Sequence, residues 1–423
     1  MSNNSVNPQT VRALESRWDE LRRNPLTLDL TRGKPAPEQL ALSDALDGIL
    51  SGDYRLEDGT DARNYGGLRG IPEARRLGAQ LLGTDPENII VCGNSSLQAM
   101  QLVMDAAMRH GLCDERFSAL GSAHAVVPVP GYDRHFALTE SFDIEMIPVP
   151  MTATGPDMDT LEETIRSDSQ CRFLWCVPKY SNPTGCIYDP ATVDRIAALP
   201  NKAHGPLLIL WDNAYAVHDF NFPKAELAPI LTSARKHGTD DSIVMFASTS
   251  KITFAGGGIA FIGGSETTLN AIEARLAVMT IGPDKVNQLR HAKFLNGRVD
   301  DHMAAHARIL KPKFETVERS LQTHLGNRDL ETHLGNRDLA TWTRPDGGYF
   351  VTLSTAPGFA TQVVAMAATA GVVLTPAGAT FPYGHDPEDS VIRIAPTFAS
   401  NDEIEKAIEI LAVCLQLSMR RSS

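Results

Sequence analysis

Short apolar runs alternate with helix-like patterns through most of this 423-residue chain. Such alternation favours an α/β fold with a largely parallel sheet, because each strand–helix unit returns the chain to the same end of the sheet. The expected strands are 89–92, 125–129, 144–149, 173–177, 207–211, 243–247 and 259–262, and the expected helices between them include 97–107, 189–199 and 266–278. We therefore expect one large α/β domain over residues 51–304.

The rest of the chain has a different pattern. A long helical pattern runs from about residue 286 to 322, and the expected strands that follow are 348–353, 372–374 and 391–395. A last helix is predicted at 401–419, with Asn401 as its N-cap. At the other end, a helix is expected at 11–23, followed by an extended arm with Pro25 and Gly33-Lys34-Pro35. We expect residues 1–50 and 305–423 to form a smaller α+β domain together.

The composition excludes several classes of protein. The 39 basic and 51 acidic residues give a net charge of −12, which disfavours a general nucleic-acid binder because such proteins need a basic face. No apolar run approaches the roughly 18 residues of a membrane span, and the polar start predicts no signal peptide. The 6 cysteines form no CxxC pair. We expect a cytoplasmic protein with buried thiols and with neither nucleic acid nor membrane as a partner.

A perfect tandem duplication interrupts the C-terminal part. Residues 323–330 recur as 332–339, and each copy carries Gly-Asn, which is a turn signal. Two copies are too few for a solenoid, which needs at least three repeats. We expect a surface connection without function, and we expect no metal site from its two histidines.

The segment Ser248-Thr249-Ser250-Lys251 carries the strongest chemical signal. It follows an expected strand and precedes Gly256-Gly257-Gly258, so the lysine stands where α/β sheets bind ligands. Burial would lower the pKa of this lysine, and the neutral amine could then form a Schiff base. A lone lysine at a strand end is more often exposed to solvent, and the glycine run is no dinucleotide fingerprint because it leads into a strand.

Three further strands end in polar clusters. Asp212 and Tyr215 follow one strand, Asn182 lies in the Asn-Pro-Thr-Gly segment after another, and Gly93-Asn94-Ser95-Ser96 opens a helix after a third. Each cluster has an ordinary alternative, since an aspartate can cap a helix and Asn-Pro-x-Gly can form a turn. Four such clusters in one domain together predict a ligand site at one edge of the sheet.

In this order the four clusters resemble the pyridoxal-phosphate-dependent aminotransferases of fold type I, class I/II. The resemblance covers nearly the whole chain and extends to the divergent aspartate aminotransferase branch of actinobacteria, which is related to the effector domains of MocR-type regulators. It implies a large domain with a mostly parallel mixed sheet and a small α+β domain. It also implies that Lys251 binds pyridoxal 5′-phosphate covalently and moves the α-proton, while Asp212 lies beneath the pyridine nitrogen. Tyr215 and Asn182 would bond to the phenolic oxygen.

Further segments match the same family. In Pro130–His135 the resemblance implies that Tyr132 stacks on the cofactor ring and that His135 lies behind Asp212. Tyr65, in Asn64–Gly70, would reach the phosphate of a neighbouring subunit, which implies a homodimer with shared active sites. Arg393 would bind the substrate α-carboxylate through its bidentate fork. The further residues expected on the substrate side are Asn182, Gly33 and Lys34.

One position departs from the family. The arginine that commonly binds the phosphate eight residues after the lysine is replaced by Ile259. Phosphate binding must then depend on other residues, and the expected set is Ser95, Ser96, Ser248, Ser250, Tyr65 and Lys285. Lys285 could instead bind a distal substrate carboxylate, a role for which Lys34 and Arg134 are rivals.

The resemblance implies transamination, with aspartate and 2-oxoglutarate giving oxaloacetate and glutamate. The alternatives on the same fold are a transaminase of another amino acid, a β-lyase and a decarboxylase. A MocR-like regulatory module is a further alternative, but it needs a basic DNA-binding domain. Only about 50 residues precede the large domain here, and they include Asp19, Glu20, Asp29 and Glu38.

Overall fold

The computed structural model describes residues 8–112, 115–326 and 339–421. Its largest sheet has eight strands, of which the five central ones run parallel to one another. In spatial order the strands are β2 (Ile89–Val91), β9 (Ala260–Gly264), β8 (Ile243–Ser248), β7 (Leu208–Asp212), β6 (Cys171–Cys176), β3 (His124–Val129), β4 (Glu145–Thr152) and β5 (Gly155–Pro156). Strands β9 and β5 are antiparallel to their neighbours. The predicted α/β class with a mostly parallel mixed sheet is confirmed.

Helices cover both faces of this sheet. The alternation of side chains along the strands shows which helices cover which face. In β7, Ile209 and Trp211 belong to one apolar core, whereas Leu208 and Leu210 belong to another. The first core also contains residues of α3 (Pro72–Leu82), α6 (Met158–Ser167), α7 (Pro190–Ala198) and α8 (Ile230–His237). The second contains residues of α4 (Ser96–His110), α5 (Asp133–Glu140) and α9 (Glu266–Met279). Strands buried on both faces explain the continuous apolar runs in the sequence.

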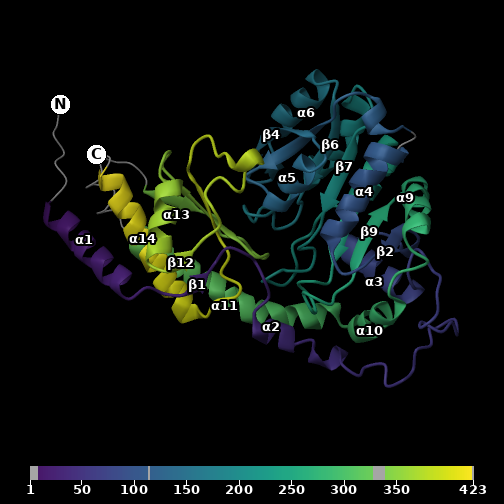
Figure 1. The fold of residues 1–423 in the computed structure, drawn as a ribbon, viewed down its shortest axis with the longest axis horizontal. Helices are drawn as coiled ribbons and strands as arrows, with labels where there is room; N and C mark the ends of the chain where they lie inside the picture. Colours follow the sequence, from purple (N-terminus) through teal and green to yellow (C-terminus); the bar gives the residue numbers. More distant parts are fainter. Residues whose placement is uncertain (1–7, 113–114, 327–338, 422–423) are drawn as a thin grey trace.

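A third core lies around two smaller sheets. An antiparallel sheet joins β10 (Ala340–Trp342), β11 (Val351–Thr355) and β13 (Val391–Ile394). A parallel pair joins β1 (Leu28–Asp29) to β12 (Val372–Val373), which brings the N-terminal arm onto the C-terminal part. The helices here are α1 (Pro8–Arg23), α2 (Pro37–Ala41), α13 (Ala360–Thr369) and α14 (Asn401–Arg421). Figure 1 shows α1, α13 and α14 grouped on the side of the molecule opposite the large sheet.

The long helical pattern predicted at 286–322 is two helices. α10 (Lys285–Leu295) ends before Gly297, whose φ of +65° is unfavourable for other residues, and α11 (Val299–Leu325) then begins. α11 contributes Val299 and Met303 to the core of the large sheet, and Leu310 and Phe314 to the core of the smaller sheets. This helix therefore connects the two parts of the molecule (Figure 1).

Two local predictions were wrong in detail. The strand expected from residue 348 begins only at Val351, because Gly348 has a φ of +82° that a strand cannot accommodate. The predicted N-cap Asn401 is already helical. Ser400 caps α14 instead: its hydroxyl accepts from the Glu403 backbone N–H, and the Glu403 carboxylate accepts from the Ser400 backbone N–H.

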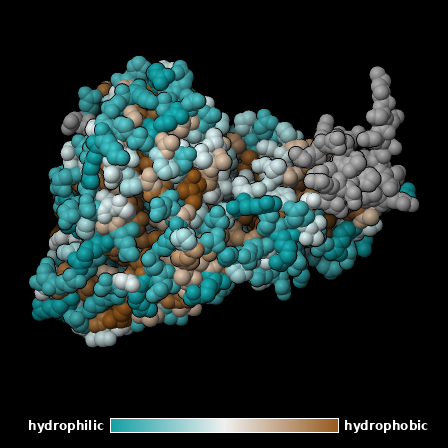
Figure 2. All heavy atoms as spheres, turned by 180° about the vertical axis from the view of Figure 1, so that it is seen from behind, coloured by the Kyte–Doolittle hydropathy of each residue, from teal (hydrophilic) through white to brown (hydrophobic). Residues whose placement is uncertain are grey.

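The tandem duplication was expected to lie wholly in a surface connection. Its first residues, 323–325, instead form the last turn of α11, because the helical pattern continues into them. Residues 327–338 lie outside the described residues. None of the helices in the described part of the chain combines the length and apolar composition needed to cross a membrane. Hydrophilic residues cover most of the face in Figure 2, with smaller hydrophobic areas among them.

Candidate active site

Four neighbouring strands bring the predicted chemical residues to one edge of the large sheet. β8, β7, β6 and β3 lie side by side and parallel, so their carboxyl ends meet at the same edge. Lys251 follows β8, Asp212 ends β7, Asn182 follows β6, and Tyr132 follows β3. Ligands of open α/β sheets bind at this edge, which makes it the candidate active site.

Lys251 lies in a tight turn directly after β8. The turn is closed by hydrogen bonds from the backbone N–H groups of Ile252 and Thr253 to the Thr249 carbonyl, both 2.8 Å. Gly258 packs against it so closely that a Cβ atom would lie 2.8 Å from Thr249 Oγ1. Burial lowers the pKa of the Lys251 amine, and the Asp212 carboxylate offsets part of this effect. The amine is therefore easier to deprotonate than an exposed lysine.

Asp212 is buried beside His135. The His135 Nε2 lies 2.9 Å from Asp212 Oδ2, and the imidazole stacks on Trp175 with ring centroids 4.0 Å apart. Since a carboxylate can only accept, His135 donates from Nε2. The second carboxylate oxygen, Oδ1, is also buried and has no hydrogen-bond partner among the described residues. Leaving such an oxygen unpaired costs about 1–3 kcal/mol, so this oxygen is available to a ligand N–H group.

Two tyrosine rings lie beside Lys251 and the Asp212–His135 pair. The Lys251 Nζ lies 5.1 Å from the Tyr215 ring centroid, and the half-buried Tyr132 ring meets His135 edge-on with centroids 4.9 Å apart. Burial raises the pKa of Tyr215 well above its usual value, with Tyr132 and Asp212 adding to the effect. Burial likewise raises the pKa of Tyr132 to about 12. Both phenols stay protonated and can donate a hydrogen bond.

Arg393 lies on β13 and reaches this edge from the smaller sheet. Its Nη1 donates to Asp133 Oδ1 at 2.9 Å and to Asn182 Oδ1 at 3.2 Å. Its Nε donates to Thr375 Oγ1 and its Nη2 to the Thr31 carbonyl, both at 3.2 Å. The predicted substrate residues Arg393 and Asn182 are thus brought together. The sequence analysis did not predict Asp133 or Thr375 as partners of Arg393. Their only signal was a position near an expected strand or turn, and many residues share such a position.

A candidate anion subsite lies around the start of α4. Ser95 caps this helix by accepting from the Gln98 backbone N–H at 3.4 Å, and Ser96 is the first helical residue. The Ser250 hydroxyl donates to the Asn94 carbonyl at 3.0 Å, and Ser248 ends the neighbouring strand β8. Helix N-termini with free N–H groups favour phosphate and other anions. Four of the predicted phosphate residues therefore lie on adjoining segments.

Position 259 supplies no cation to this subsite. Ile259 is buried in the core, and its backbone N–H donates to Thr249 Oγ1 at 3.0 Å. The buried Lys285, at the start of α10, donates from Nζ to the Tyr65 carbonyl at 3.1 Å. The Tyr65 side chain is 81% exposed. In the described part of the chain, neither Lys285 nor Tyr65 hydrogen-bonds to Lys251, Asp212 or Arg393.

The arm before α2 borders the site. Gly33 lies so close to Phe350, the residue before β11, that a Cβ atom would be 2.8 Å from Phe350 Cζ, so a larger residue would displace this ring. Lys34 is exposed, with its Nζ 4.2 Å from the Phe398 ring centroid. Arg134, on α5, is also exposed. The Phe350 ring lies between Gly33 and Arg393, because it contacts Gly33 and also lies 5.0 Å from the Arg393 guanidinium carbon.

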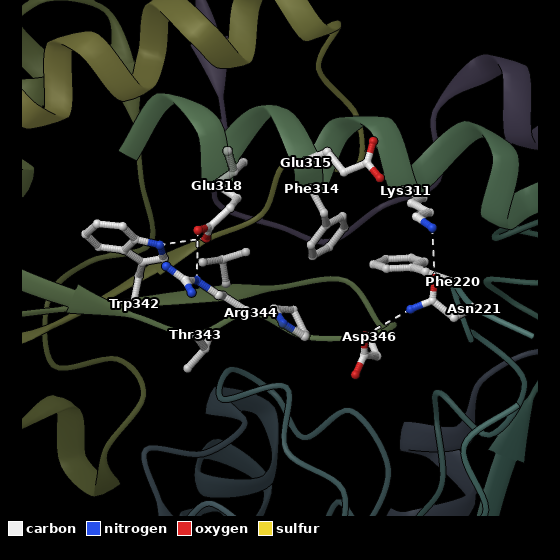
Figure 3. A pocket seen from close by; sticks show the side chains of 13 residues that line it. Phe220, Asn221, Lys311, Phe314, Glu315, Glu318, Trp342, Thr343, Arg344 and Asp346 are labelled. Atoms are coloured by element: carbon white, nitrogen blue, oxygen red, sulfur yellow. Dashed lines mark hydrogen bonds and ion pairs between the residues drawn. The ribbon is translucent and has the colours of Figure 1, made fainter. Parts of the chain in front are cut away.

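A separate hollow of about 200 Å³ lies between α11, β10 and the loop at 220–221 (Figure 3). Phe220 and Phe314 meet inside it, with ring centroids 4.7 Å apart. Glu318 accepts from Trp342 Nε1 at 2.7 Å and pairs with Arg344 at 2.8 Å. These polar groups satisfy one another, and no predicted site residue lines the hollow, so the candidate site remains at the Lys251 edge.

Comparison with known proteins agrees with this geometry. The family model described as aspartate amino-transferase matches residues 1–423. An aminotransferase of Mycolicibacterium smegmatis is 44% identical over 411 residues, covering 95% of this chain and 93% of that protein. The aspartate aminotransferase of Corynebacterium glutamicum is 39% identical over 410 residues, covering 96% and 92%.

Solved structures give the same result. The crystal structure of an aspartate transaminase from Corynebacterium glutamicum superposes with a TM-score of 0.92 at 37% identity, covering 100% of this chain and 99% of that one. Agreement in sequence and in fold extends over the whole chain. The chain belongs to the aspartate aminotransferase family, and it is an aminotransferase.

Proposed function

We propose that this chain uses pyridoxal 5′-phosphate to transfer the amino group of aspartate to 2-oxoglutarate, giving oxaloacetate and glutamate. One observation carries the proposal: a lysine with a lowered pKa shares a sheet edge with a buried aspartate whose Oδ1 lacks a donor. A neutral amine can attack an aldehyde, and a carboxylate can hold a ring N–H.

The donor set fits this cofactor. Asp212 Oδ1 would accept from the pyridine nitrogen, and the phenols of Tyr215 and Tyr132 border the same space. The start of α4, with Ser95, would receive the phosphate. Bound pyridoxal phosphate supplies an electron sink for the negative charge left when an amino acid loses its α-proton.

The remaining steps belong to side chains of this protein. The freed Lys251 amine would take the α-proton and return it at the neighbouring carbon, as a general base and then a general acid. Arg393 would hold the α-carboxylate through a bidentate pair, and its bonds to Asn182 and Asp133 fix the guanidinium for that contact. His135 would orient the Asp212 carboxylate by donating to Oδ2.

Aspartate as the donor is supported by the names of the relatives from Corynebacterium glutamicum. A dicarboxylate also needs a cation for its distal carboxylate. Lys34 belongs to the same arm as Thr31, whose carbonyl accepts from Arg393, so it can approach a substrate held by that arginine. Arg134 and Lys285 are the alternatives, and alanine variants at the three positions would distinguish them by the KM for aspartate.

We further propose a homodimer that completes the site. Exposed apolar side chains gather beside Tyr65: Val278, Met279 and Ile281 are 71%, 61% and 66% exposed. The two segments adjoin, because a Cβ atom on Gly282 would lie 2.6 Å from the Gly66 carbonyl oxygen. Exposed apolar patches of this kind favour a protein interface, and a second copy would bring its Tyr65 to the phosphate subsite.

The experiment compares the wild-type protein with Lys251→Ala. Wild-type protein loaded with pyridoxal phosphate should show the visible absorbance of a lysine-bound cofactor and lose it on addition of aspartate. Lys251→Ala should lack that absorbance and should lose at least about 10³-fold in kcat, because it has no group to move the α-proton.

Product analysis decides between the reactions. Oxaloacetate and glutamate formed from aspartate and 2-oxoglutarate support transamination, whereas alanine formed from aspartate indicates β-decarboxylation. Ammonia with pyruvate, formed from an amino acid that carries a leaving group on Cβ, indicates elimination. Retention of both absorbance and turnover by Lys251→Ala would contradict the proposed role of the lysine.

A further inference from the structure

A buried set of polar side chains holds the main chain at Lys251 and Ile252. The His302 Nε2, on α11, lies 2.7 Å from the Ile252 carbonyl oxygen. His306 lies one turn later, and its Nε2 is 3.2 Å from His302 Nε2 and faces the same oxygen. The Tyr349 hydroxyl lies 3.5 Å from the Lys251 carbonyl oxygen, and His218 Nε2 lies 3.3 Å from the same oxygen. Donors from three distant parts of the chain therefore converge on two consecutive peptide carbonyls.

The direction of each hydrogen bond follows from Gln39, on α2. The Ala36 backbone N–H donates to Gln39 Oε1 at 3.0 Å, so the amide is oriented with Nε2 as the donor. Gln39 Nε2 lies 3.0 Å from the Tyr349 hydroxyl and 3.2 Å from His306 Nδ1. His306 Nδ1 must then accept, which leaves the ring proton on Nε2 for the Ile252 carbonyl.

This arrangement requires neutral imidazoles. A second proton on His306 would point from Nδ1 at the N–H group of Gln39. Burial, and next His302, lower the pKa of His306 to about 4, and burial also lowers the pKa of His302. Burial lowers the pKa of His218 to about 3, with His306 and Lys251 adding to the effect. The donors stay in place at neutral pH and bring no positive charge to the Lys251 amine.

The same set reaches the substrate side of the site. Gln39 accepts from Ala36, the last residue of the arm that contains Gly33 and Lys34. Within this arm the Thr31 carbonyl accepts from Arg393. One buried glutamine thus connects the arm that touches the substrate arginine with the turn that carries the lysine.

We propose that Gln39, His306, His302 and Tyr349 are positioning residues that fix the Lys251 turn and couple it to the arm at residues 31–36. The proposal rests on the proposed role of Lys251 and adds the residues that hold it. Without these donors two buried carbonyls would lose partners, and the turn would shift or admit water. A displacement of about 1 Å at a reacting group can cost roughly 100-fold in rate.

The test uses Tyr349→Phe and Gln39→Leu, with Gln416→Leu as the matched control. Gln416 is also buried, and its Nε2 donates to a backbone carbonyl, that of His324 on α11. In the loaded enzyme, kcat should fall about tenfold or more in the two test variants, with the KM for aspartate nearly unchanged. The control should keep the wild-type kcat even where it lowers the free energy of unfolding.

A second measurement uses the apoprotein and does not depend on turnover. The pH dependence of Lys251 labelling by an amine-reactive reagent, followed by peptide mass spectrometry, reports the pKa of the amine. Water entering the loosened turn favours the charged form, so the labelling midpoint should rise in both test variants and stay unchanged in Gln416→Leu.

Histidine variants separate positioning from packing. His306→Gln keeps an acceptor for Gln39 and a donor for Ile252, and it should retain most of the kcat that His306→Leu loses. If Tyr349→Phe and Gln39→Leu match the control in kcat and in the labelling midpoint, the positioning role is wrong. That result would leave the Lys251→Ala test of the proposed function untouched.

Discussion

At the scale of single residues, the proposed chemistry depends on the amine of Lys251, whose burial disfavours its charged form. Removal from water lowers the pKa of Lys251, and the attraction of Asp212 compensates only in part. Keeping a reactive amine buried therefore costs stability in the protein without its cofactor, as strained or desolvated active sites commonly do.

This cost gives a pH dependence of known sign. The folded pKa of Lys251 lies below the unfolded value of 10.5, so between the two values the unfolded chain binds the extra proton. The apoprotein should gain stability as the pH rises through this window towards 10.5. Lys251→Met should be the more stable apoprotein at pH 7, and its advantage should shrink towards pH 10. Urea unfolding of both apoproteins at the two pH values checks this, and parallel pH profiles would contradict it.

At the scale of elements, the N-termini of α4 and α9 differ in their roles. Ser95 and Ser265 both cap helices by accepting a backbone N–H, at 3.4 Å from Gln98 in α4 and at 3.1 Å from Thr268 in α9. Only the α4 start adjoins the sheet edge that carries Lys251. The same local motif is thus structural in one helix and, by our proposal, also ligand-binding in the other.

Alanine variants of the two caps should separate these tasks. Each substitution should lower the free energy of unfolding by about 1 kcal/mol, the usual cost of a lost N-cap. Ser95→Ala should also weaken pyridoxal phosphate binding by roughly tenfold to a hundredfold, because a hydrogen bond to a charged group is lost. Ser265→Ala should leave this affinity unchanged. Equal cofactor affinities in the two variants, measured by titration of the apoproteins, would remove Ser95 from the phosphate subsite.

The helices and strands also show which secondary-structure features the sequence pattern could predict and which it could not. Each strand expected in the large sheet is present, because most of these strands are buried on both faces and leave a continuous apolar run. The break between α10 and α11 was missed, since an isolated Gly297 inside a helical pattern is often tolerated. The cap of α14 was misplaced by one residue because Ser400 and Asn401 are both good cap residues.

At the scale of the whole molecule, the proposed homodimer accounts for the apolar residues beside Tyr65. Ile281→Asp places a charge in the middle of this patch and should convert the dimer into monomers. It should also weaken cofactor binding, because the partner's tyrosine would be lost. Phe222→Asp is the control, since Phe222 is 53% exposed but lies outside the patch. Sedimentation velocity measures the result, and a monomeric wild-type protein or an unchanged dimer in Ile281→Asp would contradict the proposed interface.

The sequence by itself determined the strand–helix alternation, the strand-end positions of Lys251, Asp212 and Asn182, and hence the edge where they meet. These are local features, encoded in apolar runs and the polar residues that end them. Only the tertiary structure decided what each functional group touches. Arg393 meets Asp133 across 260 residues of chain, and Gln39 meets His306 across 267. Such contacts depend on how distant segments pack together, and no local pattern specifies the partner.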